Sequence, residues 1–372
     1  MGAAVLLSFN IPLLSGKQLR PLQASVDLAA LEHNLQVVRR YAPAAQVMAV
    51  IKANAYGHGL MRAASALRDA DGFAVVELDA AVRLREAGYG QPILLLEGFF
   101  SADELDVFAE FELMPVIHAR EQIEMLAAYS GASKLDVFLK INTGMNRLGV
   151  TPANFATART ALAASPKVGK ITLMTHFARA DEPEGAAAQL DTFNALTEKL
   201  PLQRSLANSA ALIADPRTHA DWVRPGIMLY GSSPFVDRGA ASLGLRAVMQ
   251  LESRIIAVQN LRPGDTVGYG ALFRAEHPMR IGVVACGYAD GYPRHALSGT
   301  PIAIGGVRTA TIGRVSMDML CADITHIPHA GVGSEVTLWG GVVSVDEVAQ
   351  AAGTVGYELL CAVSARVPMV ET

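Results

Sequence analysis

The sequence has little charge, and the charge it has is nearly balanced. Charged residues make up 18% of its 372 residues, and 31 basic against 35 acidic side chains give a formal net charge of −4. A nucleic-acid-binding domain usually carries a basic stripe, so this composition argues against a nucleic-acid partner. Hydrophobic residues make up 51%, which suits a large buried core and argues against intrinsic disorder.

Cysteine is also scarce. The three cysteines, Cys286, Cys321 and Cys361, are widely spaced and form no C-x-x-C pair. This pattern argues against a disulfide-bonded scaffold and against a metal cluster, so we expect no metal. Reduced thiols are the default for such a chain, and they indicate a cytoplasmic protein.

Long apolar runs are missing. No run approaches the roughly 20 residues of a membrane-spanning helix, so no membrane partner is expected. The first residues are apolar, but no basic segment precedes them, and Asn10 and Pro12 interrupt them. We therefore interpret residues 1–20 as a short, poorly ordered leader rather than a signal peptide.

Between residues 46 and 231 one pattern recurs: a short apolar run, a small or polar turn, and a stretch of helical composition. These runs are too short for helices and are typical of strands in a buried parallel sheet. They begin at Val47, Phe73, Pro92, Leu113, Leu135, Ile171, Arg204 and Trp222. Eight alternations of strand and helix over about 190 residues predict an α/β fold, a (β/α)8 TIM barrel.

A doubly wound open sheet is the alternative. It typically has about five or six strands and a glycine-rich first turn, and no G-x-G-x-x-G follows the first run here. Within the barrel pattern, residues 79–88 and 101–110 have helical composition. We expect Asp79 and Ser101 as their N-caps and Gly88 as a C-terminal stop.

The pattern changes after about residue 246. Strand-like runs are now separated by Pro-Gly, Gly-Gly and Gly-Asp pairs, with a short helical stretch near residues 344–353. We therefore expect a barrel at 21–246 and a mostly β domain at 247–372.

Functional residues of a barrel lie at the carboxyl ends of its strands. Here these ends carry polar residues in an otherwise apolar chain, as a small-molecule pocket requires. They include Lys52, Tyr56, Lys140, Asn142, Arg147, His176, Asn208, Ser209 and Arg224, with Gly226 and Ile227 at the last strand.

Lys52 follows an apolar run, where a charged ammonium group is costly. A lysine in such a place can act as an amine nucleophile and form a Schiff base with an aldehyde cofactor. Taken alone, Lys52 fits better with an ordinary solvated or ion-paired lysine. His176 alone is compatible with a metal ligand, but no H-x-H or H-E-x-x-H spacing accompanies it.

The segment around Lys52 changes this interpretation. AVIKANAYGHG (residues 49–59) resembles the cofactor-lysine motif of the alanine racemases, pyridoxal-phosphate enzymes with a barrel and a β domain. Further segments match that family in order: NTGMNRLG (142–149), MTHFARAD (174–181), LANSAA (206–211), RPGIMLYG (224–231), VGYG (267–270), GYADGYPR (287–294), GRVSMDM (313–319) and YELLCAVSARVP (357–368). Together they are far more specific than any one of them.

The resemblance implies interconversion of L-alanine and D-alanine, with pyridoxal 5′-phosphate as cofactor, by a homodimer with shared active sites. Lys52 would hold the cofactor, Arg147 would bind its phenolic oxygen, and Arg224 would face its ring nitrogen. The residues implied to bind its phosphate are Tyr56, Ser209, Gly226, Ile227 and Tyr357. Because an arginine keeps its proton, the ring nitrogen would stay unprotonated, which favours simple return of the proton over transamination.

Inversion of a stereocentre through a planar carbanion requires a base on each face, or one base with access to both. The resemblance implies that Lys52 is the base on one face and that Tyr269 of the partner subunit is the base on the other. His176 and Arg224 would be the hydrogen-bonded neighbours of that tyrosine. The backbone of the partner subunit's Met317 would receive the substrate carboxylate. Three further residues would line the substrate entrance and favour small anionic amino acids: Tyr288, Arg294 and Arg314.

The sequence departs from the family pattern at two positions. Lys140 matches a position that in many relatives carries a carbamate, an anion that would bind Arg147. Nearby, Asn142 stands where relatives often have aspartate. Ser205 stands where several relatives have a histidine that contacts the arginine equivalent to Arg224.

The expected function is therefore alanine racemisation, for peptidoglycan synthesis or for alanine catabolism. The alternative is a broad-specificity amino-acid racemase on the same scaffold, which would tend to lack a lysine at position 140 and to carry an export signal. A non-catalytic pyridoxal-phosphate carrier would lack the β domain. A decarboxylase would be expected to have an acid in place of Arg224.

Overall fold

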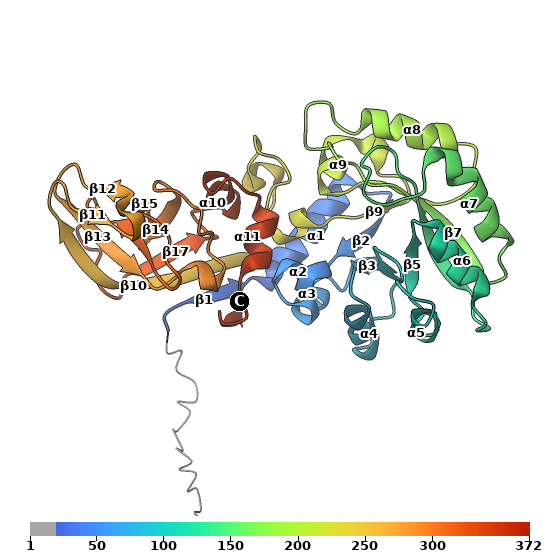
Figure 1. Cartoon of the computed structure of the whole chain (residues 1–372), viewed down its shortest axis with the longest axis horizontal. Helices are drawn as coiled ribbons and strands as arrows, with labels where there is room; N and C mark the ends of the chain where they lie inside the picture. Colours follow the sequence, from blue (N-terminus) through green and yellow to red (C-terminus); the bar gives the residue numbers. More distant parts are fainter. Residues whose placement is uncertain (1–19) are drawn as a thin grey trace, which may run out of the picture.

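The structure is a computed structural model that describes residues 20–372. The predicted leader, except for Arg20, lies outside the described residues. Two domains lie side by side along the long axis of the molecule (Figure 1). One is a parallel barrel surrounded by helices, and the other is built on a large, mostly antiparallel sheet.

The apolar runs predicted as strands form a closed barrel within the described chain, which confirms the predicted fold. All residues of β3 and β4 are buried, and burial on both faces explains why the runs are continuously apolar rather than alternating. The barrel strands are β2 (Gln46–Val50), β3 (Gly72–Val75), β4 (Ile93–Leu95), β5 (Met114–Ile117), β6 (Leu135–Lys140), β7 (Val168–Met174), β8 (Arg204–Ser205) and β9 (Trp222–Val223).

The helices before and between these strands cover the outside of the barrel (Figure 1), except for the short segment Lys52–Tyr56, which lies at its mouth. Each places a few apolar residues inward; α7, for example, buries Phe155, Ala158 and Leu162, which are three or four residues apart. The helices are α1 (Leu28–Tyr41), α2 (Lys52–Tyr56), α3 (Leu60–Ala66), α4 (Leu78–Glu86), α5 (Glu104–Glu110), α6 (Arg120–Ala128), α7 (Pro152–Ala164), α8 (Ala187–Thr197) and α9 (Ser209–Ala214).

Two predicted helix caps were wrong. Helix α4 begins after Glu77, so Asp79 lies within its first turn, where its carboxylate interacts favourably with the helix dipole instead of capping. Helix α5 begins after Asp103 rather than at Ser101. The predicted stop is confirmed: Gly88 follows the C-cap of α4 with φ +87°.

The second domain contains a sheet with the strand order β13-β16-β15-β14-β17-β10-β1-β18 among the described residues. Strand β1 (Gln23–Val26) lies in the range expected for the barrel, yet it pairs with β10 and β18 of this sheet. The other strands of the sheet are β10 (Met249–Leu261), β13 (Met279–Val284), β14 (Pro301–Ile304), β15 (Val307–Ile312), β16 (Leu320–Asp323), β17 (Glu335–Trp339) and β18 (Met369–Glu371).

Within residues 20–372, no helix has the length and apolar character needed to cross a membrane.

Two short helices lie between β17 and β18 in the chain, α10 (Val345–Ala351) and α11 (Gly356–Ala362). Helix α11 lies between the domains (Figure 1). A Cβ atom on Gly57 would lie 2.2 Å from the carbonyl oxygen of Leu360, and a Cβ atom on Gly291 would lie 2.3 Å from that of Ala362. The two glycines therefore allow α11 to contact one turn of each domain, backbone against backbone.

We expect Gly57→Ala to destabilise the protein more than Gly88→Ala. Both residues have a left-handed φ, +83° and +87°, so each substitution carries a backbone cost of roughly 1–3 kcal/mol. At residue 57 the new Cβ atom also collides with α11, whereas nothing lies within 4 Å at residue 88. Calorimetry should show the lower unfolding midpoint for Gly57→Ala, by about 5 °C. Equal midpoints would contradict the importance of this contact.

Candidate active site

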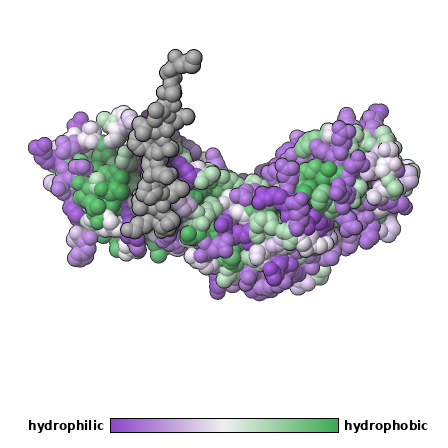
Figure 2. All heavy atoms as spheres, turned by 90° about the horizontal axis from the view of Figure 1, so that it is seen from below, coloured by the Kyte–Doolittle hydropathy of each residue, from purple (hydrophilic) through white to green (hydrophobic). Residues whose placement is uncertain are grey.

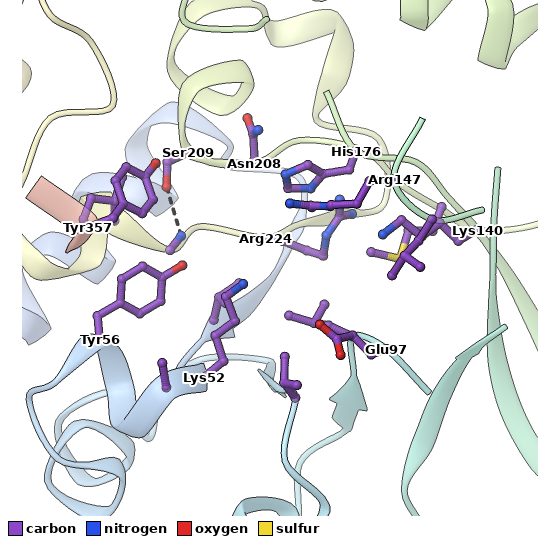
Figure 3. Close-up of a pocket in the computed structure, with 18 of the residues that line it drawn as sticks. Lys52, Tyr56, Glu97, Lys140, Arg147, His176, Asn208, Ser209, Arg224 and Tyr357 are labelled. Atoms are coloured by element: carbon purple, nitrogen blue, oxygen red, sulfur yellow. Dashed lines mark hydrogen bonds between the residues drawn. The ribbon is translucent and has the colours of Figure 1, made fainter. Parts of the chain in front are cut away.

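A cavity of about 720 Å³ opens at the carboxyl ends of the barrel strands. This volume is in the range of small-molecule and cofactor sites. The cavity brings together eleven of the predicted site residues: Lys52, Tyr56, Lys140, Arg147, His176, Asn208, Ser209, Arg224, Gly226, Ile227 and Tyr357. Figure 3 labels all of them except Gly226 and Ile227. All but Tyr357 come from barrel segments, and Tyr357 comes from α11.

Lys52 stands at the start of a left-handed turn. It directly follows the buried residue Ile51 and is itself half-buried, with its side chain toward the cavity (Figure 3). The four residues after it, 53–56, have φ between 52° and 56°. Left-handed helical backbone costs roughly 1–2 kcal/mol for each non-glycine residue, so the surrounding structure must stabilise this turn.

His58 provides part of that stabilisation. It is fully buried, and its Nδ1 lies 2.9 Å from the carbonyl oxygen of Ala55 and 3.0 Å from that of Tyr56, so Nδ1 is the nitrogen that donates. Burial lowers the pKa of His58 to about 4, which keeps the ring neutral. The Tyr230 ring stacks on both His58 and Tyr56, with centroids 4.6 Å apart in each pair. The position of Tyr56 is fixed as a result.

Hydroxyl groups and backbone amides meet beside Tyr56. Ser209 Oγ accepts a hydrogen bond of 2.9 Å from the Gly226 amide (Figure 3). A Cβ atom on Gly226 would lie 2.5 Å from the Tyr56 hydroxyl, so only glycine permits this approach. Ile227 begins the 3-10 helix η2 (Ile227–Tyr230), and the first amides of a helix have no partner within it. This group of donors is suited to a phosphate.

Arg224 is held on several sides. Its Nη1 donates to Ser205 Oγ over 2.6 Å, and its Nη2 donates to the carbonyl oxygens of Thr175 and Leu206 over 2.6 and 3.1 Å. The residue is only 4% exposed, and burial lowers its pKa to about 9, which leaves it a cation at neutral pH. The unusual Ser205 therefore directly contacts Arg224.

Positive charge dominates the cavity. Burial lowers the pKa of Lys140 to about 8, and the charges of Arg224, Arg147 and Lys52 contribute. Burial and the same cationic surroundings hold the pKa of His176 well below its usual value, so it is neutral. Glu97 is the one acidic residue lining the cavity in the described chain. The cavity can therefore bind anionic groups strongly.

Sequence reasoning missed two residues with ionisable side chains that line this cavity, Glu97 and Cys361. Glu97 follows the apolar run of β4, so a carboxylate at a strand end was an available signal. Cys361 lies four residues after Tyr357 on α11, and residues at this spacing share a helix face.

Asn142, in the barrel, does not line the cavity, and the other predicted site residues lie outside it on the β domain: Tyr269, Tyr288, Arg294, Arg314 and Met317. Tyr269 is 71% exposed and Met317 is 53% exposed. The Arg294 guanidinium lies 6.0 Å from the centre of the Tyr288 ring. The roles implied for these residues remain predictions.

Comparison with known proteins agrees with the resemblance. Family models for the N-terminal and C-terminal domains of alanine racemase match residues 26–234 and 248–371. Alanine racemase of Nitrosospira multiformis is 60% identical, and a catabolic alanine racemase of Klebsiella aerogenes is 53% identical; each match covers 94% of this chain and 99% of the relative.

Solved structures agree as well. The crystal structure of biosynthetic alanine racemase from Pseudomonas aeruginosa has a TM-score of 0.92 and 49% sequence identity, over 95% of this chain and 99% of that one. Alanine racemase from Acinetobacter baumannii has a TM-score of 0.89 and 39% identity, over 95% and 100%. The chain therefore belongs to the alanine racemase family, isomerases that interconvert the two enantiomers of alanine.

Proposed function

We propose that this chain racemises alanine with two bases on opposite faces of the α-carbon, using pyridoxal 5′-phosphate bound in the barrel cavity. The observation that carries the proposal is the composition of that cavity. In the cavity, Lys52 lies near hydroxyl and amide groups that can donate hydrogen bonds to a phosphate. Cationic side chains line the same cavity.

The cavity residues fit this cofactor. Gly226 leaves room that a side chain would fill, and Tyr56 and Ser209 bring hydroxyl groups to the same place. Lys52 would hold the cofactor, Arg147 would bind its phenolic oxygen, and the phosphate would be bound by Tyr56, Ser209, Gly226, Ile227 and Tyr357. When bound, the cofactor would withdraw electrons from the α-carbon and so make its C–H bond acidic.

Two proton carriers would then complete the reaction. Lys52 Nζ would exchange the proton on the face of the α-carbon that yields D-alanine. The hydroxyl of the partner subunit's Tyr269 would exchange the proton on the face that yields L-alanine. His176 is neutral and is a suitable hydrogen-bond neighbour for that hydroxyl. Arg224 would keep the cofactor ring nitrogen unprotonated, which favours return of the proton over transamination.

A homodimer would supply the second base. Among the described residues, the tyrosines that line the cavity are Tyr56 and Tyr357, both assigned to the phosphate. The β domain exposes Tyr269, Leu272 and Met317, and hydrophobic residues gather on its surface in Figure 2. Exposed apolar groups of this kind suit contact with a second copy.

In that dimer the partner's β domain would complete the cavity. The backbone of the partner subunit's Met317 would receive the substrate carboxylate together with Arg147. The substrate entrance would be lined by the partner's Tyr288, the partner's Arg294 and the partner's Arg314.

The cellular role has two candidates. The chain is similar both to a relative named catabolic and to one named biosynthetic, so alanine degradation and D-alanine supply for peptidoglycan both suit this site. A cytoplasmic location agrees with the three free cysteines. Lys140 favours alanine racemisation over the alternative of a broad-specificity racemase.

We expect Lys52→Ala and Tyr269→Phe each to lower racemisation at least about 100-fold, because each removes one proton carrier. Unfolding and refolding the two variants together should restore about one quarter of the parent activity. Half of randomly paired dimers are mixed, and each mixed dimer has one intact site. Optical rotation of L-alanine measures the rate.

Each variant refolded alone is the control for this mixture. A mixture no more active than the single variants would contradict the sharing of sites. Parent-rate racemisation by Tyr269→Phe in both directions would contradict the two-base assignment.

We also expect Lys140 to take up carbon dioxide as the pH rises through about 8, the pKa to which burial and nearby cations lower it. The neutral amine would form an N–C bond with carbon dioxide and release one proton, which replaces a buried cation by an anion near Arg147. Carbon-13 NMR in labelled bicarbonate should show a carbamate signal that Lys140→Arg lacks. Identical spectra for the two proteins would show that Lys140 remains an amine.

A further inference from the structure

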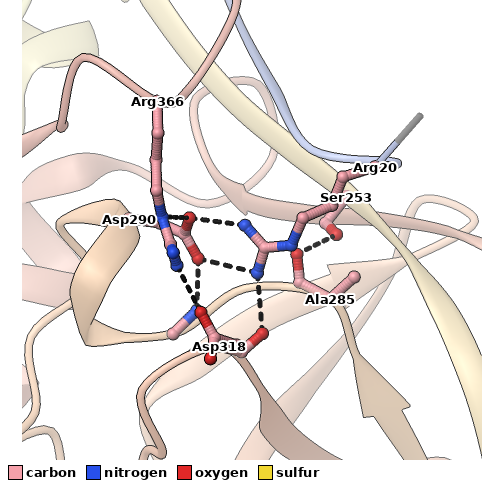
Figure 4. A network of polar contacts seen from close by, with 7 residues as sticks. Arg20, Ser253, Ala285, Asp290, Asp318 and Arg366 are labelled. Carbon is pink, nitrogen blue, oxygen red and sulfur yellow. Dashed lines mark hydrogen bonds and ion pairs between the residues drawn. The ribbon is translucent and has the colours of Figure 1, made fainter. Parts of the chain in front are cut away.

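A buried carboxylate in the β domain has no part in the cavity described above. Asp290 is 0% exposed and lies at the centre of a polar network (Figure 4). Its Oδ1 accepts hydrogen bonds from Arg20 (2.5 Å) and Arg366 (2.7 Å), and its Oδ2 accepts from Arg20 (2.9 Å) and the Gly287 amide (2.8 Å). Burial alone would raise the pKa of Asp290, but these donors hold it below its usual value. The carboxylate is therefore charged at neutral pH.

Both arginines also reach a second segment of chain. Arg20 Nη2 donates to the carbonyl oxygen of Asp318 over 2.7 Å, and Arg366 Nη2 donates to Asp318 Oδ1 over 2.7 Å (Figure 4). Each arginine thus joins the 3-10 turn η5 (Tyr288–Asp290) to the segment 316–318. Two independent cationic links fix the same pair of segments.

The backbones of these segments are in direct contact. The Tyr288 and Ala289 amides donate to the carbonyl oxygens of Ser316 and Met317, each over 3.0 Å. A Cβ atom on Gly287 would lie 2.3 Å from the Met317 carbonyl oxygen, so a larger residue would push the segments apart. The position of Met317 therefore depends on the turn that Asp290 closes.

These segments carry residues that point away from the molecule. Met317 is 53% exposed and Tyr288 is 37% exposed, and neither lines the cavity of its own chain. Under the proposed function, both serve the cavity of the partner subunit. A stabilised turn beneath them would matter most to that neighbouring site.

We propose that Asp290, with Arg20 and Arg366, is a positioning cluster that holds Met317 and Tyr288 in place to bind substrate in the partner's active site. The inference rests on the proposed function, because it requires shared sites. None of the three residues contacts the cavity that would hold the cofactor. The cluster should therefore influence substrate binding and leave cofactor binding unchanged.

We expect Asp290→Asn to raise the KM for alanine about tenfold and to change kcat less than about threefold, since the loss falls on the substrate-binding backbone. The visible spectrum of the bound cofactor should be unchanged. Arg366→Gln provides a second, milder test, because Asp290 then keeps Arg20. Arg308→Gln, which breaks the exposed ion pair to Glu347 in the same domain, is the matched control and should keep the parent KM.

Mixed dimers test whether the effect crosses the interface. Lys52→Ala and Asp290→Asn chains would carry different affinity tags, so that the mixed dimer can be purified. Its one active site takes Lys52 from the Asp290→Asn chain and the segment 316–318 from the chain with intact Asp290. If the inference is correct, this site has the parent KM, because its segment 316–318 is supported by an intact Asp290. Its Lys52 nevertheless comes from the chain that carries Asp290→Asn.

A raised KM in this mixed dimer would overturn the inference, because Asp290 would then act within its own subunit. The parent KM in both Asp290→Asn and Arg366→Gln homodimers would also overturn it. The mixture of Lys52→Ala and Tyr269→Phe identifies failure of the proposed function itself. If that mixture gains no activity, the active sites are not shared and the inference fails with the proposed function. If the mixture gains activity, an unexpected KM contradicts only the role proposed for Asp290.

Discussion

Repulsion among cations at the mouth of the barrel is the constraint on which this site depends. Lys52, Lys140, Arg147 and Arg224 line one cavity with a single acid, Glu97, in the described chain. Like charges raise one another's free energy where they are partly buried. Burial first, and then the charges of these neighbours, lower the pKa of Lys140. Anions relieve the repulsion, so the same feature favours a phosphate, a substrate carboxylate and a carbamate.

The barrel meets this constraint with rigid backbone. Arg224 is fixed by Ser205 and by carbonyl oxygens, and Lys52 leaves its strand through a left-handed turn that His58 stabilises. Fixed donors bind an anion without first being reordered, which lowers the entropic cost of binding. The strained turn at residues 53–56 is thus part of the preparation of the site.

The barrel could be predicted from the sequence because strands buried on both faces are continuously apolar. The caps at Asp79 and Ser101 could not, since these helices begin after Glu77 and Asp103 without a side-chain capping hydrogen bond that a sequence pattern would reveal. The left-handed turn was hidden, because Ala53 and Ala55 have no local preference for it. The cavity residues could be grouped from strand ends, but Tyr269 and Met317 could not be placed by composition or spacing, because sequence order does not say which subunit a loop serves.

Helix α11 has a mechanical consequence. Its last turn touches both domains: the carbonyl of Leu360 meets Gly57, next to the turn that carries Lys52, and the carbonyl of Ala362 meets Gly291, next to the turn that carries Tyr288. Neither contact includes a side chain that could rotate to absorb a displacement. The loop after Lys52 and the turn of Tyr288 therefore share one support, the last turn of α11, and a compound bound against that turn would disturb both places at once.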